Sequence, residues 1–229
     1  MNRHARAIAL VCALLAPVLV WSQSAPAGEM AGCDGQQAAG LDINATESLI
    51  RGLRGASFPE LQRVDLRVRT FHSQSDYLRT RFSLGRFFLP AQMRFFIEVN
   101  PAMFQQQAPS DGVCGILAHE LVHVVSLSHG NRIRRIGLVR LLSKGPTARF
   151  ERATDLEAVH RGYADGLKSY RDWLYAHIPA GKVAYKQRNY FSPVEIESVE
   201  ARLRTQPDLY EYWRKHVPMN LREIEAAPH

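Results

Sequence analysis

The sequence predicts an α+β fold, in which a small N-terminal β-sheet is followed by a mainly helical C-terminal half. Three observations support this prediction. Apolar and polar residues alternate in three short segments before Pro101, helical apolar spacing dominates from Asp111 onward, and breaks containing Gly or Pro divide the second half into separate helices. The chain has 229 residues, of which 46% are hydrophobic and 22% charged, so its composition is that of an ordinary globular protein.

The N-terminus has the pattern of a secretory signal peptide. Arg3 and Arg6 precede an apolar run from Ala7 to Trp21, and small residues follow up to Ala27. We therefore expect residues 1–27 to be removed and residues 28–229 to form a single domain that is periplasmic or secreted. A membrane anchor is the alternative, but the apolar run is short for a spanning helix and contains Pro17.

Two cysteines, Cys33 and Cys114, remain after this cleavage, and in an oxidising compartment they form one candidate disulfide. It would join the mature N-terminus to the helix that follows Asp111. A competing interpretation is that Met30-Ala31-Gly32-Cys33 resembles a bacterial lipoprotein processing box. Lipidation at Cys33 would leave Cys114 as a buried free thiol.

The remaining elements follow in order along the chain. A helix is predicted around Thr46 to Leu53, and strands are predicted near residues 63–69, 77–84 and 93–99. Gly85-Arg86 marks a turn, and Asn100-Pro101 ends the strand region. Later helices are separated by breaks at residues 129–130, 144–146, 179–181 and 192–193.

The segment His119-Glu120-Leu121-Val122-His123 lies inside a predicted helix, with a start signal at Ser110-Asp111-Gly112 and a stop signal at Ser128-His129-Gly130. Four residues advance a helix by little more than one turn, so both imidazoles point to the same side. Two such histidines can bind one Zn²⁺ per chain, while Glu120 lies beside them and can act as a general base.

A catalytic zinc site normally has three protein ligands, and two candidates compete for the third position. Glu151 and Asp155 have i, i+4 spacing on a later helix, so Glu151 can bind zinc while Asp155 accepts a hydrogen bond from a ligand imidazole. The alternative is His129, whose spacing matches an extended motif with a third histidine. Because Ser126 replaces the glycine of that motif and the helical pattern continues through Leu127, the sequence favours Glu151.

With these residues the chain resembles the gluzincin group of zinc metallopeptidases, which includes thermolysin-like enzymes and membrane-associated or periplasmic peptidases. The resemblance covers His119-Glu120-x-x-His123 and the later Glu151-x-x-x-Asp155. It implies a zincin-like fold, in which a small sheet lies over the motif helix and an edge strand pairs with an extended peptide substrate. The segment Phe95 to Val99 is the candidate for that edge strand.

These observations favour zinc-dependent hydrolysis of peptide bonds outside the cytoplasm. A zinc amidohydrolase acting on cell-wall peptides and a catalytically silent zinc-stabilised binding module are the alternatives. Several residues carry groups suitable for an oxyanion donor, but the sequence singles out none of them: His160, Tyr163, Tyr185, Arg188 and Tyr190.

The expected partner is a peptide or protein substrate. The formal net charge is +7, and it becomes +5 without Arg3 and Arg6, so association with an anionic envelope surface is also expected. Basic residues are most concentrated from Arg132 to Arg140, although this pattern is also typical of the solvated face of a helix. No nucleic-acid-binding module accompanies the charge, so a nucleic-acid partner is not expected.

Overall fold

The computed structural model describes residues 33, 42–83, 93–129 and 148–228. Within these ranges the chain is mostly helical with one small sheet, and the strands precede most of the helices, which confirms the predicted α+β class. The predicted signal peptide at residues 1–27, the turn at Gly85-Arg86 and the basic segment from Arg132 to Arg140 lie outside the described residues, and they stay predictions.

The first half of the chain forms the helix α1 (Ile43–Ala56), the 3-10 helix η1 (Pro59–Leu61) and the strands β1 (Asp65–Thr70), β2 (Leu78–Phe82) and β3 (Arg94–Val99). The helices of the second half are α3 (Ala102–Gln105), α4 (Ser110–His129), α6 (Ala148–His160), α7 (Ala164–His177), α8 (Ala180–Asn189), α9 (Pro193–Thr205), α10 (Leu209–Lys215) and α11 (Leu221–Glu225). All three predicted strands are present within a few residues of their expected bounds. The breaks at 179–181 and 192–193 also separate helices as expected.

The three strands are arranged in the order β1-β3-β2, with β1 parallel and β2 antiparallel to β3. Phe95 and Ile97 of β3 are buried, and the residues paired with them on β1 and β2 belong to the same inner face. The expectation that the segment Phe95 to Val99 is an edge strand is wrong. Its backbone is paired on both sides, so within the described sheet only β1 and β2 have a free edge.

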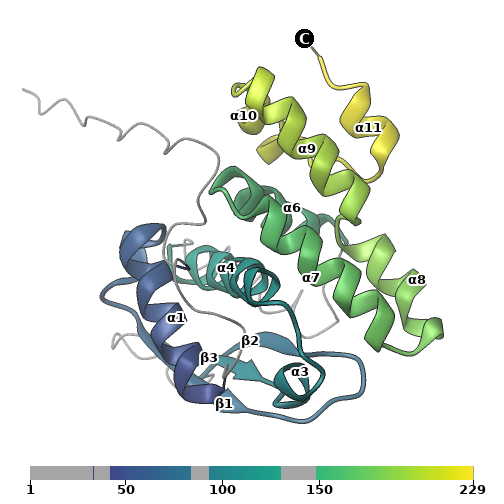
Figure 1. The fold of residues 1–229 in the computed structure, drawn as a ribbon. Coiled ribbons are helices and arrows are strands. Elements are labelled where there is room, and N and C mark those ends of the chain that lie inside the picture. Colours follow the sequence, from purple (N-terminus) through teal and green to yellow (C-terminus); the bar gives the residue numbers. More distant parts are fainter. Residues whose placement is uncertain (1–32, 34–41, 84–92, 130–147, 229) are drawn as a thin grey trace, which may run out of the picture.

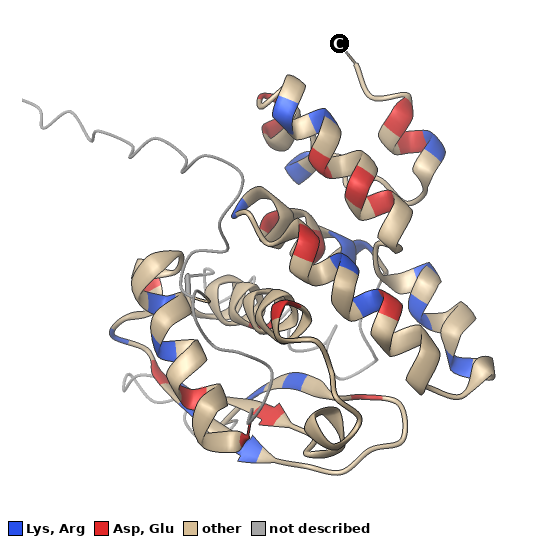
Figure 2. Ribbon diagram, in the orientation of Figure 1, with Lys and Arg blue, Asp and Glu red and all other residues tan. Residues whose placement is uncertain are grey.

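Helix α4 lies between the sheet and the helices α6 and α7, as Figure 1 shows. Asp111 and Glu120 are its only Asp, Glu, Lys or Arg residues, so its ribbon is almost entirely tan in Figure 2. Most of its apolar side chains are buried from Val113 to Leu127. A helix that is apolar on nearly all sides requires packing partners around it, which here are the sheet on one side and the later helices on the other.

Two glycines permit the close approach of α4 and α7. A Cβ atom added at Gly115 would lie 2.3 Å from the backbone of Gly166, and one added at Gly166 would lie 2.5 Å from the carbonyl oxygen of Asp111. Side chains at these positions would force the two helices apart. The close contact places the middle of α7, including Arg171, beside the buried face of α6.

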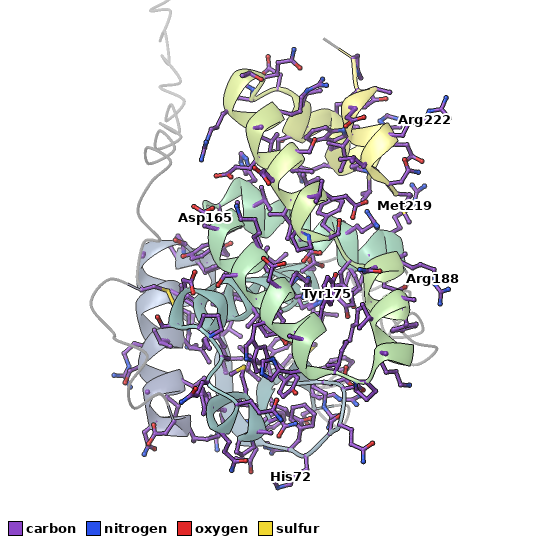
Figure 3. The ribbon with its side chains drawn as sticks, turned by 45° about the vertical axis from the view of Figure 1, so that its right-hand side comes forward. His72, Asp165, Tyr175, Arg188, Met219 and Arg222 are labelled. Carbon is purple, nitrogen blue, oxygen red and sulfur yellow. A yellow bond between two sulfur atoms is a disulfide. The ribbon has the colours of Figure 1, made fainter. Side chains whose placement is uncertain are left out.

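Cys33 and Cys114 form a disulfide, so the predicted pair is present in the structure. The bond joins the segment before α1 to the first half of α4, and Figure 3 shows it in yellow. Because it uses the sulfur atom that lipidation would modify, it excludes a thioether at Cys33 in the same molecule. Among the described helices, none is both long enough and apolar enough to cross a bilayer.

We expect the double variant Cys33→Ala/Cys114→Ala to unfold more easily, since the bond joins residues separated by 81 positions. In the chain-entropy model, a loop of this length contributes about 4 kcal/mol to the free energy of unfolding. Urea unfolding of the oxidised protein and of the variant measures the difference, and reduction of the wild type should reproduce it. An unchanged unfolding free energy, or a lipid adduct on Cys33 in the intact mass, would contradict the disulfide.

Candidate metal centre

Helix α4 carries His119, Glu120 and His123 into the protein interior. Each of the three residues is less than one tenth exposed. Glu151 on the first turn of α6 is buried opposite the two histidines. One ligand atom from each of His119, His123 and Glu151 lies within 4.8 Å of the others, so this buried group is able to bind a metal ion.

The three ligand atoms form a nearly equilateral triangle. The Nε2 atoms of His119 and His123 are 3.1 Å apart, and the Oε2 atom of Glu151 lies 3.2 Å from the first and 3.1 Å from the second. Ligands bound tetrahedrally at the usual metal–nitrogen and metal–oxygen distances are separated by about 3.3 Å. The triangle therefore has dimensions that fit three ligands on one small divalent ion.

Hydrogen bonds orient both imidazoles so that their Nε2 lone pairs face this triangle. His119 Nδ1 lies 2.7 Å from the Oδ1 atom of Asp155, a carboxylate that accepts a hydrogen bond from it. His123 Nδ1 lies 3.4 Å from the hydroxyl of Thr154, which itself donates to the carbonyl of Phe150 at 2.9 Å and therefore accepts from the imidazole. With both Nδ1 atoms protonated, each Nε2 is an acceptor.

When both imidazoles are neutral, three acceptor atoms converge with no donor among them, an arrangement that favours a cation, either a proton or a metal ion, at their centre. The pKa values of His119 and Glu151 also show that the site favours positive charge. Burial alone lowers the pKa of His119, but the carboxylates of Asp155 and Glu151 outweigh burial and raise it to about 9. Burial raises the pKa of Glu151, whereas His123 and His119 outweigh it and hold that pKa below its ordinary value. Protons and a metal ion therefore compete for the same atoms.

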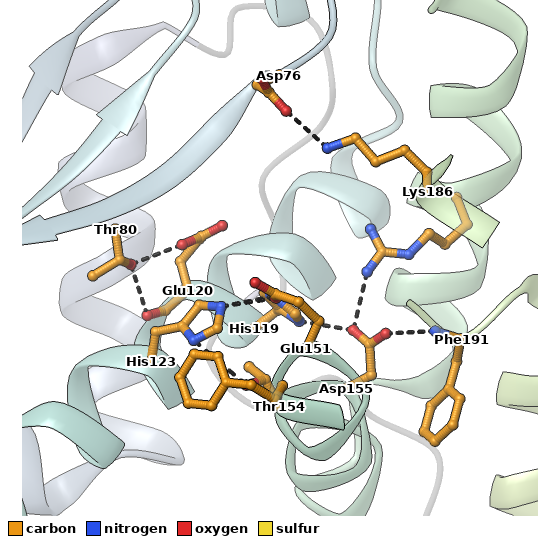
Figure 4. Close-up of polar contacts among 12 residues, drawn as sticks. Asp76, Thr80, His119, Glu120, His123, Glu151, Thr154, Asp155, Lys186 and Phe191 are labelled. Atoms are coloured by element: carbon orange, nitrogen blue, oxygen red, sulfur yellow. Dashed lines mark hydrogen bonds and ion pairs between the residues drawn. The ribbon is translucent and has the colours of Figure 1, made fainter. Parts of the chain in front are cut away.

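Asp155 holds His119 in place and is itself held by two further donors. Its carboxylate is completely buried and accepts hydrogen bonds from the Arg171 guanidinium at 3.0 Å and from the backbone N–H of Phe191 at 2.8 Å (Figure 4). Burial raises the pKa of Asp155, but Arg171 and His119 outweigh this effect and lower it. Asp155 therefore stays ionised beside the ligand imidazole.

Glu120 lies outside the group of three ligand atoms. The hydroxyl of Thr80 on β2 is 2.7 Å from its Oε2 atom and also 3.1 Å from its backbone carbonyl oxygen. Figure 4 shows Glu120 turned towards Thr80 and the sheet, while Glu151 approaches from the opposite side. Glu120 is thus a carboxylate next to His119 in the chain that does not belong to the group of candidate ligands.

His129 remains an alternative ligand on sequence grounds. The extended motif requires a turn after the second histidine, and the backbone of α4 has no turn there. Helix α4 continues without interruption through Ser126 to His129. Six residues beyond His123, a continuous helix has advanced about 9 Å along its axis. The side chain of His129 lies outside the described residues, so its role stays a prediction for the metal measurement below.

Among the five oxyanion-donor candidates, the structure brings Tyr190 next to a proposed ligand. Its ring centroid is 5.9 Å from that of His119, 4.6 Å from the Arg171 guanidinium and 5.3 Å from the Lys186 ammonium. The other four have different surroundings. Tyr163 donates to the hydroxyl of Ser57, His160 stacks on Tyr210, Tyr185 is exposed, and Arg188 points outwards in Figure 3.

Three contributors to the site were not predicted from the sequence: Thr80, Thr154 and Arg171. Thr154 directly precedes Asp155 on α6, so the sequence placed it close to the candidate ligands. The i, i+4 spacing considered only Glu151 and Asp155. Thr80 and Arg171 carried no comparable signal, because each meets its partner only through tertiary packing.

The comparisons with known proteins add no assignment: no protein-family model, curated protein or solved structure matches the chain.

We expect one metal ion per chain in the zinc-loaded protein and its loss in Glu151→Ala, since that substitution removes one corner of the ligand triangle. Asp155→Ala should weaken binding by about tenfold or more, because His119 loses its orienting partner. Elemental mass spectrometry and competitive titration with a chromophoric chelator measure both effects.

Two variants serve as controls for this measurement. Asp165→Ala removes an exposed carboxylate from α7 and should leave the metal content unchanged. His129→Ala should also retain the metal. Loss of metal in His129→Ala together with retention in Glu151→Ala would transfer the third ligand to His129.

Proposed function

We propose that this protein is a zinc-dependent metallopeptidase acting outside the cytoplasm, with Glu120 as its general base. The proposal rests on the ligand atoms of His119, His123 and Glu151, which lie close together. It also rests on the separate carboxylate of Glu120, which the Thr80 hydroxyl holds. Two imidazoles and one carboxylate are typical ligands of catalytic zinc, which keeps a further position for water or substrate. A purely structural zinc site usually has four protein ligands and has no need of the additional carboxylate.

The order of the elements supports a zincin-like fold and membership of the gluzincin group. Strands precede the helix that carries the two histidines, and a later helix carries Glu151 and Asp155. The sheet contacts the histidine helix through β2, whose outer edge is free within the described sheet. We therefore propose β2, rather than β3, as the strand that pairs with an extended peptide.

In the proposed mechanism His119, His123 and Glu151 hold the ion, and Asp155 and Thr154 keep the two imidazoles in the required tautomer. When bound, zinc supplies Lewis-acid chemistry that polarises the scissile carbonyl and acidifies a water molecule. Glu120 accepts a proton from the attacking water as its oxygen bonds to the carbonyl carbon. Glu120 then returns this proton to the amide nitrogen as the carbon–nitrogen bond breaks.

Tyr190 is the proposed donor to the oxygen of the reacting carbonyl. Its ring lies beside His119, and burial together with the carboxylate of Glu151 raises the pKa of Tyr190 well above its ordinary value. The phenol therefore keeps its proton at neutral and moderately alkaline pH. A hydroxyl donor at this position stabilises negative charge as it develops in the transition state.

The disulfide supports a location outside the cytoplasm, since such bonds form and persist in oxidising compartments. We accordingly propose a periplasmic or secreted protein whose substrates are peptides or proteins. An amidase acting on cell-wall peptides has the same machinery, so a substrate screen should include both unstructured peptides and peptidoglycan fragments. A silent binding module would bind the metal but hydrolyse neither class.

Glu120→Gln should retain the metal and lose hydrolysis, because the amide has the shape of the carboxylate but cannot accept the proton. We expect the turnover number to fall by at least about 100-fold. Cleavage of a quenched-fluorescent peptide library, with metal content determined on the same samples, measures this. Glu197→Gln on the exposed side of α9 is the matched control. Full activity in the Glu120 variant would refute the proposed mechanism.

Tyr190→Phe should lower kcat by about 100-fold, since it removes one donor to the developing oxyanion. Metal affinity should not change, because the ring that packs beside His119 is retained. Tyr185→Phe makes the same chemical change on the exposed side of α8 and is the control, which should leave kcat unchanged. A variant that changes only KM, or only the metal content, would show that Tyr190 has a different role.

A further inference from the structure

The register of the sheet gathers arginines on the face that points away from α4. Residues alternate between the two faces of each strand, and Phe95, Ile97 and Val99 lie on the buried inner face. The remaining positions of the three paired strands form the opposite face: Asp65, Arg67, Arg69, Arg79, Arg81, Arg94, Phe96 and Glu98. We call this set of residues the arginine face; it has five arginines and two carboxylates.

Ion pairs within the arginine face orient its side chains, but two carboxylates do not neutralise the charge of five arginines. Asp65 pairs with Arg94 at 2.6 Å and lies 3.4 Å from Arg67. Glu98 pairs with Arg79, also at 2.6 Å. The two carboxylates are thus engaged by the arginines nearest to them on neighbouring strands, which leaves an excess of positive charge on this face.

The excess charge is exposed at three arginines. Arg67, Arg69 and Arg81 are exposed, and the side chain of Arg67 retains 58% of its accessible area. The Arg69 guanidinium lies 3.3 Å from the centroid of the Phe96 ring, which is only 6% exposed. Within the described part of the chain, neither Arg69 nor Arg81 has a carboxylate partner, so both guanidinium groups are available to an external anion.

The geometry of this face fits a flat anionic surface. Neighbouring strands lie about 4.8 Å apart, and alternate residues on one strand are about 7 Å apart, so the guanidinium groups form a two-dimensional array. Guanidinium groups bind phosphate oxygens in a bidentate manner and are less strongly hydrated than ammonium groups. Phe96 is covered by Arg69, which indicates contact with headgroups rather than insertion into the acyl chains.

We propose that the arginine face binds the phosphate groups of an anionic phospholipid surface. Each uncompensated basic residue near such a surface adds roughly fivefold in affinity, and the net positive charge, which is +7 for the full chain and +5 without Arg3 and Arg6, strengthens the long-range attraction. The site is separate from the proposed metal centre, because α4 packs against the inner side of the sheet. Figure 2 shows the charged positions of the strands below α4.

The test uses the mature full-length protein and two kinds of vesicle, phosphatidylcholine alone and phosphatidylcholine mixed with phosphatidylglycerol. We expect binding to the mixed vesicles only, in flotation assays, with an affinity that falls as salt is added. Arg69→Gln/Arg81→Gln should weaken this binding by about 30-fold. Arg67→Gln/Arg81→Gln should weaken binding to a similar extent. This variant keeps the contact between Arg69 and Phe96, so a loss of binding in both variants does not arise from the loss of that contact.

The matched control is Arg204→Gln/Arg214→Gln, which removes the same charge from the exposed sides of α9 and α10. It should bind the mixed vesicles within about twofold of the wild type. Equal losses in the control and in the face variants would overturn the proposal, because they would show a dependence on net charge alone. Absence of binding at low salt, or tighter binding to duplex DNA than to the mixed vesicles, would also overturn it.

Discussion

The buried carboxylate of Asp155 is the constraint on which the rest of the structure depends. It accepts hydrogen bonds from His119 on α4, from Arg171 on α7 and from the backbone of Phe191, just before α9. A fully buried charge is costly unless its hydrogen-bonding capacity is satisfied, so these three elements must meet at α6 in one arrangement. The same requirement that holds the helices together also orients the His119 imidazole towards the candidate metal site.

The helices and the sheet each supply a different part of the candidate site. Helix α6 brings Glu151 and Asp155 to one side of α4, whereas β2 brings Thr80 to the side that holds Glu120. Glycines at the contact of α4 with α7 allow Arg171 to approach Asp155 closely. All three candidate metal ligands therefore lie on helices, whereas the hydrogen-bond partner of the proposed base Glu120 comes from the sheet. The candidate site thus draws on both the helices and the sheet, which pack on different sides of α4.

The ligand triangle was predictable because its signals are local. His119 and His123 share a side of one helix by their spacing, as do Glu151 and Asp155 on another, and carboxylate and imidazole are complementary as zinc ligands. The strands were predictable for the same reason, since alternation is a property of consecutive residues. The prediction that β3 lies at the edge was wrong, because strand order depends on which strands pair, and here β1 and β2 both pair with β3. Alternation within a strand carries no information about its neighbours.

By itself the sequence determined the type and approximate bounds of the main elements, the two histidines and two carboxylates of the candidate site, and the cysteine pair. Each follows from spacing along the chain or from the chemistry of a single residue type. Only the tertiary structure decided that Thr80, Thr154 and Arg171 orient those residues, that Tyr190 lies beside His119, and that five arginines share one face of the sheet. Most of these contacts join different elements of the chain, and they arise from packing and strand register, which sequence periodicity does not encode.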